Sequence, residues 1–294
     1  LSGFCRQVPK ENVCCRGGAG ARVPMAAKKA GAKALPCVQP LPEAASGQGM
    51  IRELVIHIGD PKNGSSSIQK AMQAGACHCE TATIAVQREV NASSLALSLF
   101  PKRKTPEERQ EQRRLTFSEK AAWARAETAD LGIISAEHFS VVPPTALKQA
   151  LQEFLPELAE TARVIAYVRP HAGRALSGYA QRVKVGVAHR TLDRYTDFII
   201  ENGPLYYAPR FANWQKAFDG RFSLYPFLRG EMRGGDVVED FFHHVLQGAP
   251  FTLEEIPSTN ESLALEELAA LRRIQYGLKN HGVARFLRLS LGAA

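Results

Sequence analysis

The sequence contains no apolar run of the roughly 18 residues that a membrane-spanning helix needs, and its opening residues lack the apolar block of a secretory signal. Cysteine is also scarce: there are six in 294 residues, and only Cys77 and Cys79 lie beyond residue 37. A secreted fold stabilised by disulfides would carry cysteines throughout its core. These absences predict a protein without a membrane span, located in the cytoplasm.

A metal site is not expected either. The Cys77-His78-Cys79 segment places three potential ligands in three consecutive residues. No second cluster of cysteine or histidine follows to complete a tetrahedral site. We therefore predict that this chain binds no metal.

The positive charge is concentrated near the beginning of the chain. Residues 1–50 contain seven Lys and Arg against two Glu, so they account for +5 of the formal net charge of +8. The remainder is only mildly basic. Such a balance fits an enzyme that handles anionic ligands, but it is also common in proteins that have none.

The character of the chain changes at Met50. Residues 1–49 are rich in Ala, Gly, Pro and Lys and show no period of 2 or 3.6, which predicts a disordered or artefactual N-terminal extension. We predict that Met50 is near the natural start and that the preceding stretch is an upstream extension or a processed tail. The Arg-bearing, acid-poor composition also permits a transit peptide. Residues 50–294 are predicted to form a single α/β domain.

Strands and helices are predicted to alternate through this domain. Apolar runs indicate strands in "MIRELVIHIG" (50–59), "LGII" (131–134), "RVIAYV" (163–168) and "FSLYPF" (222–227). Helical patterns separate them, beginning with a helix at about 65–75 that Ser65 or Ser66 caps and Gly75 ends. This order predicts a central, mostly parallel sheet flanked by helices, with ligands at the carboxyl ends of the strands.

The segment "IHIGDPKNGSSS" (56–67) has the composition of an anion-binding loop. Gly59 and Gly64 allow close turns, and the amides at the start of the following helix favour a negative group, to which Lys62 adds its charge. The loop is not a Walker A motif, because Ser65 stands where that motif has its lysine directly after the last glycine.

The order Pro-Lys-x-Gly-Ser-Ser resembles the 5'-phosphosulfate loop of the sulfotransferases that use 3'-phosphoadenosine 5'-phosphosulfate (PAPS). The resemblance implies a P-loop-like three-layer α/β fold, PAPS as co-substrate and no metal. It also implies that the donor's 5' side is bound by the loop residues Lys62, Asn63, Gly64, Ser65, Ser66 and Ser67. Asn63 departs from the family, which usually has Thr or Ser there.

A second segment, "RVIAYVRPHAGRALSGYAQ" (163–181), resembles the 3'-phosphate site of the same family. The resemblance assigns Arg169, at the end of a strand, and Ser177, in the following helix, to the 3'-phosphate. An arginine fork at such a position suits phosphate. The likeness extends weakly over residues 50–275, and it departs at Pro170-His171, where the family commonly has Asp-Pro.

Sulfuryl transfer needs an in-line acceptor, charge stabilisation on the leaving oxygen and a base. Lys62 is the candidate for stabilising the leaving bisphosphate. Glu137, just past a strand end, is the candidate base, and His138 is the second candidate because relatives use either residue type. Glu137 can equally cap a helix or pair with an arginine. Asp60 is expected to point away from the anion, to pair with Lys62 or to bind the acceptor.

Two other functions compete with this hypothesis. A P-loop nucleotide kinase shares the strand-loop-helix arrangement, and a non-catalytic nucleotide-binding member of the fold would keep the site without turnover. The acceptor is expected to be a small molecule or carbohydrate bearing a hydroxyl or an amine, contacted from residues 77–130 and 186–210. No nucleic-acid partner is expected.

Overall fold

The computed structural model describes residues 49–87, 89–100, 105–187, 191–203, 205–256 and 264–291. The chain divides into two units, residues 1–43 and 44–294, and all described residues belong to the second. Apart from Gly49, the predicted N-terminal extension lies outside the described residues. Its state therefore stays a prediction.

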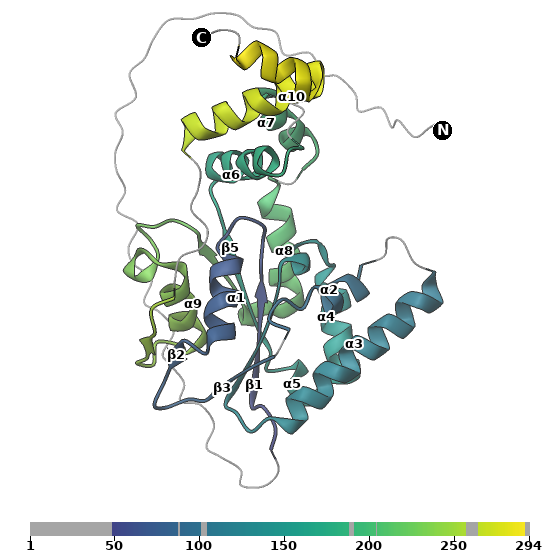
Figure 1. The fold of residues 1–294 in the computed structure, drawn as a ribbon. Coiled ribbons are helices and arrows are strands. Elements are labelled where there is room, and N and C mark those ends of the chain that lie inside the picture. Colours follow the sequence, from purple (N-terminus) through teal and green to yellow (C-terminus); the bar gives the residue numbers. More distant parts are fainter. Residues whose placement is uncertain are drawn as a thin grey trace, which may run out of the picture. The chain divides into compact units, whose positions relative to one another are not determined.

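Five parallel strands form the central sheet in the order β3-β4-β1-β5-β6 (Figure 1). The four predicted strands are present, and the bounds of all five are β1 (Glu53–Ile58), β3 (Ile84–Val86), β4 (Leu131–Ala136), β5 (Arg163–Val168) and β6 (Phe222–Pro226). The edge strand β3 was not predicted, nor was a separate antiparallel pair of β2 (Cys77–His78) and β7 (Thr252–Leu253). These three strands are too short for a hydrophobic period to be visible in the sequence.

The side chains of the central strands alternate between two apolar cores, one on each face of the sheet. Leu54, Ile56 and Ile58 of β1 belong to one core, whereas Val55 belongs to the other. This alternation is what a strand buried on both faces requires.

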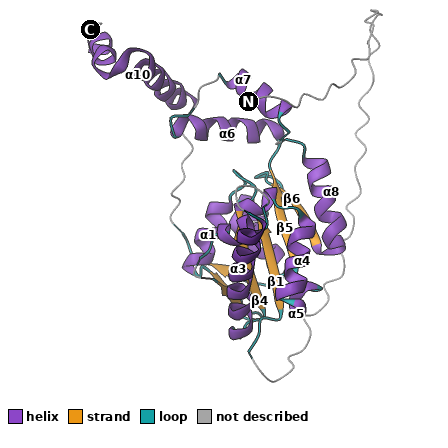
Figure 2. Ribbon diagram, turned by 90° about the vertical axis from the view of Figure 1, so that its right-hand side faces the viewer, coloured by secondary structure: helices purple, strands orange, loops and turns teal. Residues whose placement is uncertain are grey.

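Helices cover both faces (Figures 1 and 2). One face packs against α1 (Ser65–Ala74) and α9 (Val237–Val245), the other against α3 (Pro106–Ala126), α4 (Pro144–Phe154) and α8 (Tyr207–Phe218). The predicted three-layer α/β fold is thereby confirmed. The other helical elements are α2 (Ser93–Ser98), η1 (Glu137–Val141), α5 (Pro156–Ala159), α6 (His171–Lys184), α7 (Leu192–Glu201), η2 (Asp219–Arg221), η3 (Arg233–Gly235) and α10 (Leu265–Leu291).

The start of α1 differs from the prediction. Gly64, in a left-handed conformation, is the N-cap, and no side chain caps the helix, so the expected serine cap is wrong. Gly75 ends the helix as predicted, also in a left-handed conformation.

Within the part of the chain that the structure describes, no helix combines the length and apolar character needed to cross a bilayer.

The carboxyl ends of β1, β4 and β5 lie at one edge of the sheet. Ile58 of β1 is in register with Ala136 of β4 and with Ala166 of β5. The segments that follow these strands begin at Gly59, Glu137 and Arg169. Three parts of the predicted site therefore emerge side by side from neighbouring parallel strands.

Candidate active site

The loop after β1 is held in a strained conformation. The N–H of Gly59 donates to the carbonyl of Ala136 (3.1 Å), and the N–H of Asn63 donates to the carbonyl of Asp60 (3.2 Å). Lys62 has a φ of 71°, a left-handed conformation that costs a side-chain-bearing residue about 1–2 kcal/mol. Such strain persists where the surrounding structure imposes it, and it is concentrated at functional sites.

Close packing fixes the turn from this loop into α1. A Cβ atom added to Gly59 would lie 2.8 Å from Ser65 Oγ and 3.1 Å from the backbone nitrogen of Glu137. One added to Gly64 would lie 2.7 Å from Val237 Cγ1 and 2.9 Å from Phe227 Cε2. The two glycines therefore allow the loop, α1 and the Glu137 turn to approach one another.

The first amides of α1 open toward this loop. The N–H groups of Ser67 and Ile68 both donate to the carbonyl of Gly64, so the N–H groups of Ser65 and Ser66 precede the first helical bonds. Ser65 is buried, and its hydroxyl has no hydrogen-bond partner among the described residues, whereas Ser66 and Ser67 are exposed. This arrangement suits an anion.

Asn63 has a structural role in the loop. Its side chain is buried, and its Nδ2 donates to the carbonyl of Tyr167 at 2.5 Å and to Asp60 Oδ2 at 3.4 Å. Its backbone N–H closes the turn onto Asp60. The backbone and side-chain N–H donors of Asn63 are therefore engaged within the protein, and its predicted role as a ligand-binding residue has no free donor to support it.

Arg169 meets the loop directly. Its guanidinium donates from one NH group to the Lys62 carbonyl at 3.0 Å and stacks over Phe227, 5.1 Å from the ring centroid. Gly173 makes room for it, because a Cβ there would lie 3.2 Å from Arg169 Nε. Burial and the nearby Arg174 guanidinium lower the pKa of Arg169. An anion at this position would offset both effects.

The Lys62 ammonium donates to Gln181 Oε1 of α6 at 2.7 Å. Burial lowers the pKa of Lys62, the Glu137 carboxylate opposes that shift, and Lys184, Arg174 and Arg169 lower it further. Four cationic side chains, Lys62 among them, thus interact electrostatically at the loop. Among the described residues, no carboxylate forms an ion pair with Lys62. Sequence reasoning missed Arg174, Gln181 and Lys184, although all three follow Arg169 at helical spacing.

Ser177 lies on α6 and is partly exposed. Its hydroxyl makes no hydrogen bond to another described residue. The structure therefore brings Lys62 and Arg169 together, whereas Ser177 forms no hydrogen bond with either.

Glu137 is the first residue after β4 and begins η1. Its partly buried carboxylate forms no ion pair or hydrogen bond with another described residue, and its charge acts on Lys62. His138 is exposed, and its Nδ1 lies 3.0 Å from Ser93 Oγ. His57 is fully buried in β1, where its Nδ1 lies 2.9 Å from Ser135 Oγ, and its Nε2 has no hydrogen-bond partner among the described residues.

Asp60 is 2% exposed and pairs with Arg210 of α8, whose guanidinium lies 2.9 Å from Asp60 Oδ1. Arg210 stacks over Phe211, 4.5 Å from its ring centroid. Of the three arrangements expected for Asp60, none included this partner. No local signal identifies it, because Arg210 lies 150 residues away in the sequence.

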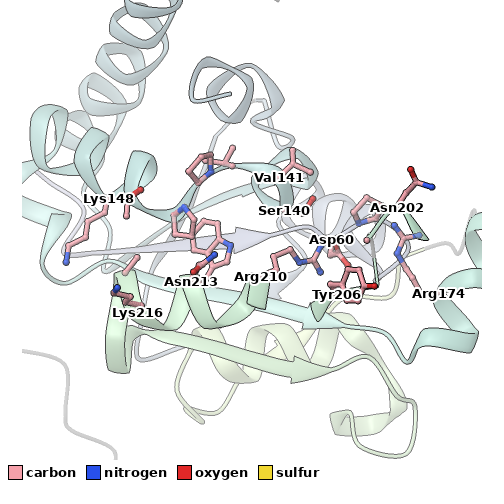
Figure 3. A pocket seen from close by; sticks show the side chains of 18 residues that line it. Asp60, Ser140, Val141, Lys148, Arg174, Asn202, Tyr206, Arg210, Asn213 and Lys216 are labelled. Carbon is pink, nitrogen blue, oxygen red and sulfur yellow. Dashed lines mark hydrogen bonds and ion pairs between the residues drawn. The ribbon is translucent and has the colours of Figure 1, made fainter. Parts of the chain in front are cut away.

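A cavity of about 1040 Å³ opens beside the loop (Figure 3). It begins at Asp60 and Pro61, and Ser140 and Arg174 also line it, whereas none of the predicted site residues does. Its walls come mainly from residues 140–148 and 202–217. The predicted acceptor regions, 77–130 and 186–210, coincide with it only in part.

Among the described residues, no group of three or more His, Cys, Asp and Glu side chains is placed to bind a metal ion. The positive charge at the loop is supplied by Lys and Arg side chains. The candidate site thus combines backbone amides, an ammonium and a guanidinium, which are groups suited to an anion, with one unpaired carboxylate and a cavity at its edge.

Comparisons with known proteins give distant structural likenesses. No family model matches the chain, and neither does any curated protein. The sulfotransferase from Alicyclobacillus acidocaldarius aligns with a TM-score of 0.44 at 18% identity over 82% of this chain and 96% of its own. The sulfotransferase domain of the Synechococcus PCC 7002 olefin synthase aligns with a TM-score of 0.30 at 16% identity over 68% and 74%.

Proposed function

We propose that this protein is a sulfotransferase that moves a sulfuryl group from PAPS to an acceptor hydroxyl or amine. The observation that carries the proposal is the 3.0 Å hydrogen bond from the Arg169 guanidinium to the Lys62 carbonyl. It joins the two sequence segments that resemble the family's 5' and 3' sites. A donor with phosphate groups at both ends requires such a pair of anion sites.

The proposed donor-binding roles combine the family resemblance with the arrangement of the loop. The amides of Ser65 and Ser66 and the Lys62 ammonium bind the 5'-phosphosulfate, and Arg169 binds the 3'-phosphate, with Ser177 as an additional hydroxyl donor. These cations repel one another when no anion is bound, so a polyanionic nucleotide that neutralises them binds favourably. When the nucleotide binds, the Lys62 ammonium replaces its hydrogen bond to Gln181 with one to the ligand.

The chemical step needs a base and a stabilised leaving group. Glu137 takes the proton from the acceptor O–H while the oxygen attacks sulfur in line with the bond to the 5'-phosphate. That sulfur–oxygen bond breaks, its electron pair remains on adenosine 3',5'-bisphosphate, and Lys62 stabilises the added charge. His138 is the second candidate for the base.

Nucleotide binding tests the donor site. Calorimetry should show that adenosine 3',5'-bisphosphate binds more tightly than adenosine 5'-monophosphate. Arg169→Gln should weaken bisphosphate binding roughly 10- to 100-fold, the range for a lost charge-assisted hydrogen bond. The monophosphate reports any general damage to the loop, since it lacks the 3'-phosphate. An equal loss of affinity for both nucleotides would show that Arg169 does not bind the 3'-phosphate.

Transfer tests the reaction. Lys62→Ala should abolish incorporation of labelled sulfate from PAPS into cell-extract acceptors while only weakening bisphosphate binding, whereas Lys70→Ala, in the middle of α1, should change neither. Unchanged transfer by Lys62→Ala would refute its role. Tight Mg-dependent ATP binding, with none to the bisphosphate, would instead identify a nucleotide kinase.

A further inference from the structure

The cavity beside the loop is strongly positive. Its lining contains four cationic side chains, which are Lys148, Arg174, Arg210 and Lys216, and one carboxylate, Asp60. Asp60 is buried and paired with Arg210, so these two charges compensate each other. The other three cations have no carboxylate within ion-pair distance among the described residues.

Lys148 and Lys216 gather at one end of this cavity (Figure 3). They come from different helices, α4 and α8, and Arg174 lies toward the opposite end, with Arg210 between. An anion bound between these two ammonium groups would interact favourably with both charges. A neutral ligand would gain no such interaction.

The start of α4 adds to this field. Pro143, Pro144 and Thr145 line the cavity at the amino end of this helix, where the helix dipole is positive. No side chain caps the helix, and no acidic residue lies in its first turn. Its terminal charge is therefore not offset by the protein's own carboxylates in the way that Glu107 and Glu108 offset that of α3.

The opposite end of the cavity reaches the proposed chemistry. Asp60 and Pro61 belong to the anion loop, and the Ser140 hydroxyl, which also lines the cavity, donates to the Glu137 carbonyl at 2.8 Å. Asp60 and Pro61 directly precede Lys62, and Ser140 lies three residues after Glu137. A molecule lying along the cavity therefore has one end beside the loop and the Glu137 turn and the other at Lys148 and Lys216.

We propose that the acceptor is an anion, whose carboxylate, sulfate ester or phosphate ester is bound by Lys148 and Lys216 while its hydroxyl faces Glu137. This inference rests on the proposed function and narrows its substrate class. The walls also carry Asn202, Tyr206 and Asn213, side chains that can hydrogen-bond a polyhydroxyl compound. Acceptors with a single hydroxyl and no charge are disfavoured by the unpaired ammonium groups.

The test separates acceptors by charge before the reaction. A cell extract is passed over an anion exchanger, and the full-length protein is given labelled PAPS with the retained and the unretained fractions separately. Transfer is expected in the retained fractions, with a KM that rises with ionic strength because exposed ion pairs are screened. Treating the retained pool with sulfatase, with phosphatase or with a carboxylate-esterifying reagent then identifies which anion is required.

The double variant Lys148→Gln/Lys216→Gln should raise the KM for the retained acceptors about tenfold, as expected for two partly exposed ion pairs. Its kcat and its affinity for adenosine 3',5'-bisphosphate should stay close to those of the unaltered protein. Lys70→Gln, which removes one lysine outside the cavity, should leave the KM unchanged.

The outcomes separate the two proposals. Transfer into the unretained fractions at an equal or higher rate, or an unchanged KM in the double variant, overturns the anionic acceptor and leaves the sulfotransferase proposal intact. Bisphosphate binding without transfer into any retained fraction also overturns it. Absence of bisphosphate binding overturns the proposed function itself.

Discussion

Gly64→Ala tests whether packing fixes the anion loop. The new Cβ would lie 2.7 Å from Val237 Cγ1 and 2.9 Å from Phe227 Cε2, and Gly64 has a φ of +77°. The left-handed backbone costs about 1–2 kcal/mol with any side chain. Overpacking against the β-branched, buried Val237 adds about 1–3 kcal/mol. We expect a total loss of roughly 2–5 kcal/mol in the free energy of unfolding.

The other end of the same helix supplies a matched control. Gly75 has a φ of +64°, and an added Cβ there would meet nothing within 4 Å. Gly75→Ala should therefore cost only the backbone contribution of about 1–2 kcal/mol. The difference between the two variants isolates the steric contact at Gly64.

Urea unfolding followed by far-UV circular dichroism measures both losses, with the slope of the transition checked for constancy. Calorimetry with adenosine 3',5'-bisphosphate provides a second readout. Gly64→Ala should weaken binding because the clash displaces the first amides of α1, whereas Gly75→Ala should not. Equal losses of stability and unaltered binding in both variants would refute the reasoning. In that case the side chains of Val237 and Phe227 would move aside at no cost in free energy.

Two further predictions concern buried charge. Burial lowers the pKa of His57 to about 3, so on acidification this histidine takes up its proton in the unfolded chain before it does in the folded protein. The stability present above pH 6.5 should therefore fall by roughly 3 kcal/mol by pH 4.5. His57→Gln should lack this component, and identical losses on acidification in both proteins would count against it. Arg210→Met leaves the buried Asp60 carboxylate unpaired and should cost about 3–5 kcal/mol in urea unfolding. Adding Asp60→Asn should recover part of that loss, and no recovery would disprove the pairing.

Local patterns predicted much of the fold and the strand ends from which the segments of the candidate site emerge. Leu54, Ile56 and Ile58 form a continuous apolar run with Val55, as a strand buried on both faces must, and Gly75 marks the helix end because left-handed backbone favours glycine. Glu137 was placed at the ligand edge because a polar residue directly follows an apolar run. These signals lie within a few residues of the features they specify.

Features that depend on contacts between distant segments were not predictable in this way. The edge strand β3 has three residues, so its pairing with β4 rather than any period makes it a strand. Gly64 and not a serine is the N-cap of α1, and Val237 and Phe227 leave no room for a side chain at this position. Asn63 resembled a ligand by position, but its amide bonds Tyr167 on β5.

The sequence by itself determined the order of strands and helices, the composition of the loop around Lys62 and the presence of Arg169 at a strand end, because each is written in neighbouring residues. Only the tertiary structure decided that Arg169 meets the Lys62 carbonyl, that Asp60 is neutralised by Arg210 and that Lys148 and Lys216 share a cavity. The physical reason is that electrostatic energy depends on distance in space. The parallel sheet and its flanking helices set those distances, not the spacing of the residues along the chain.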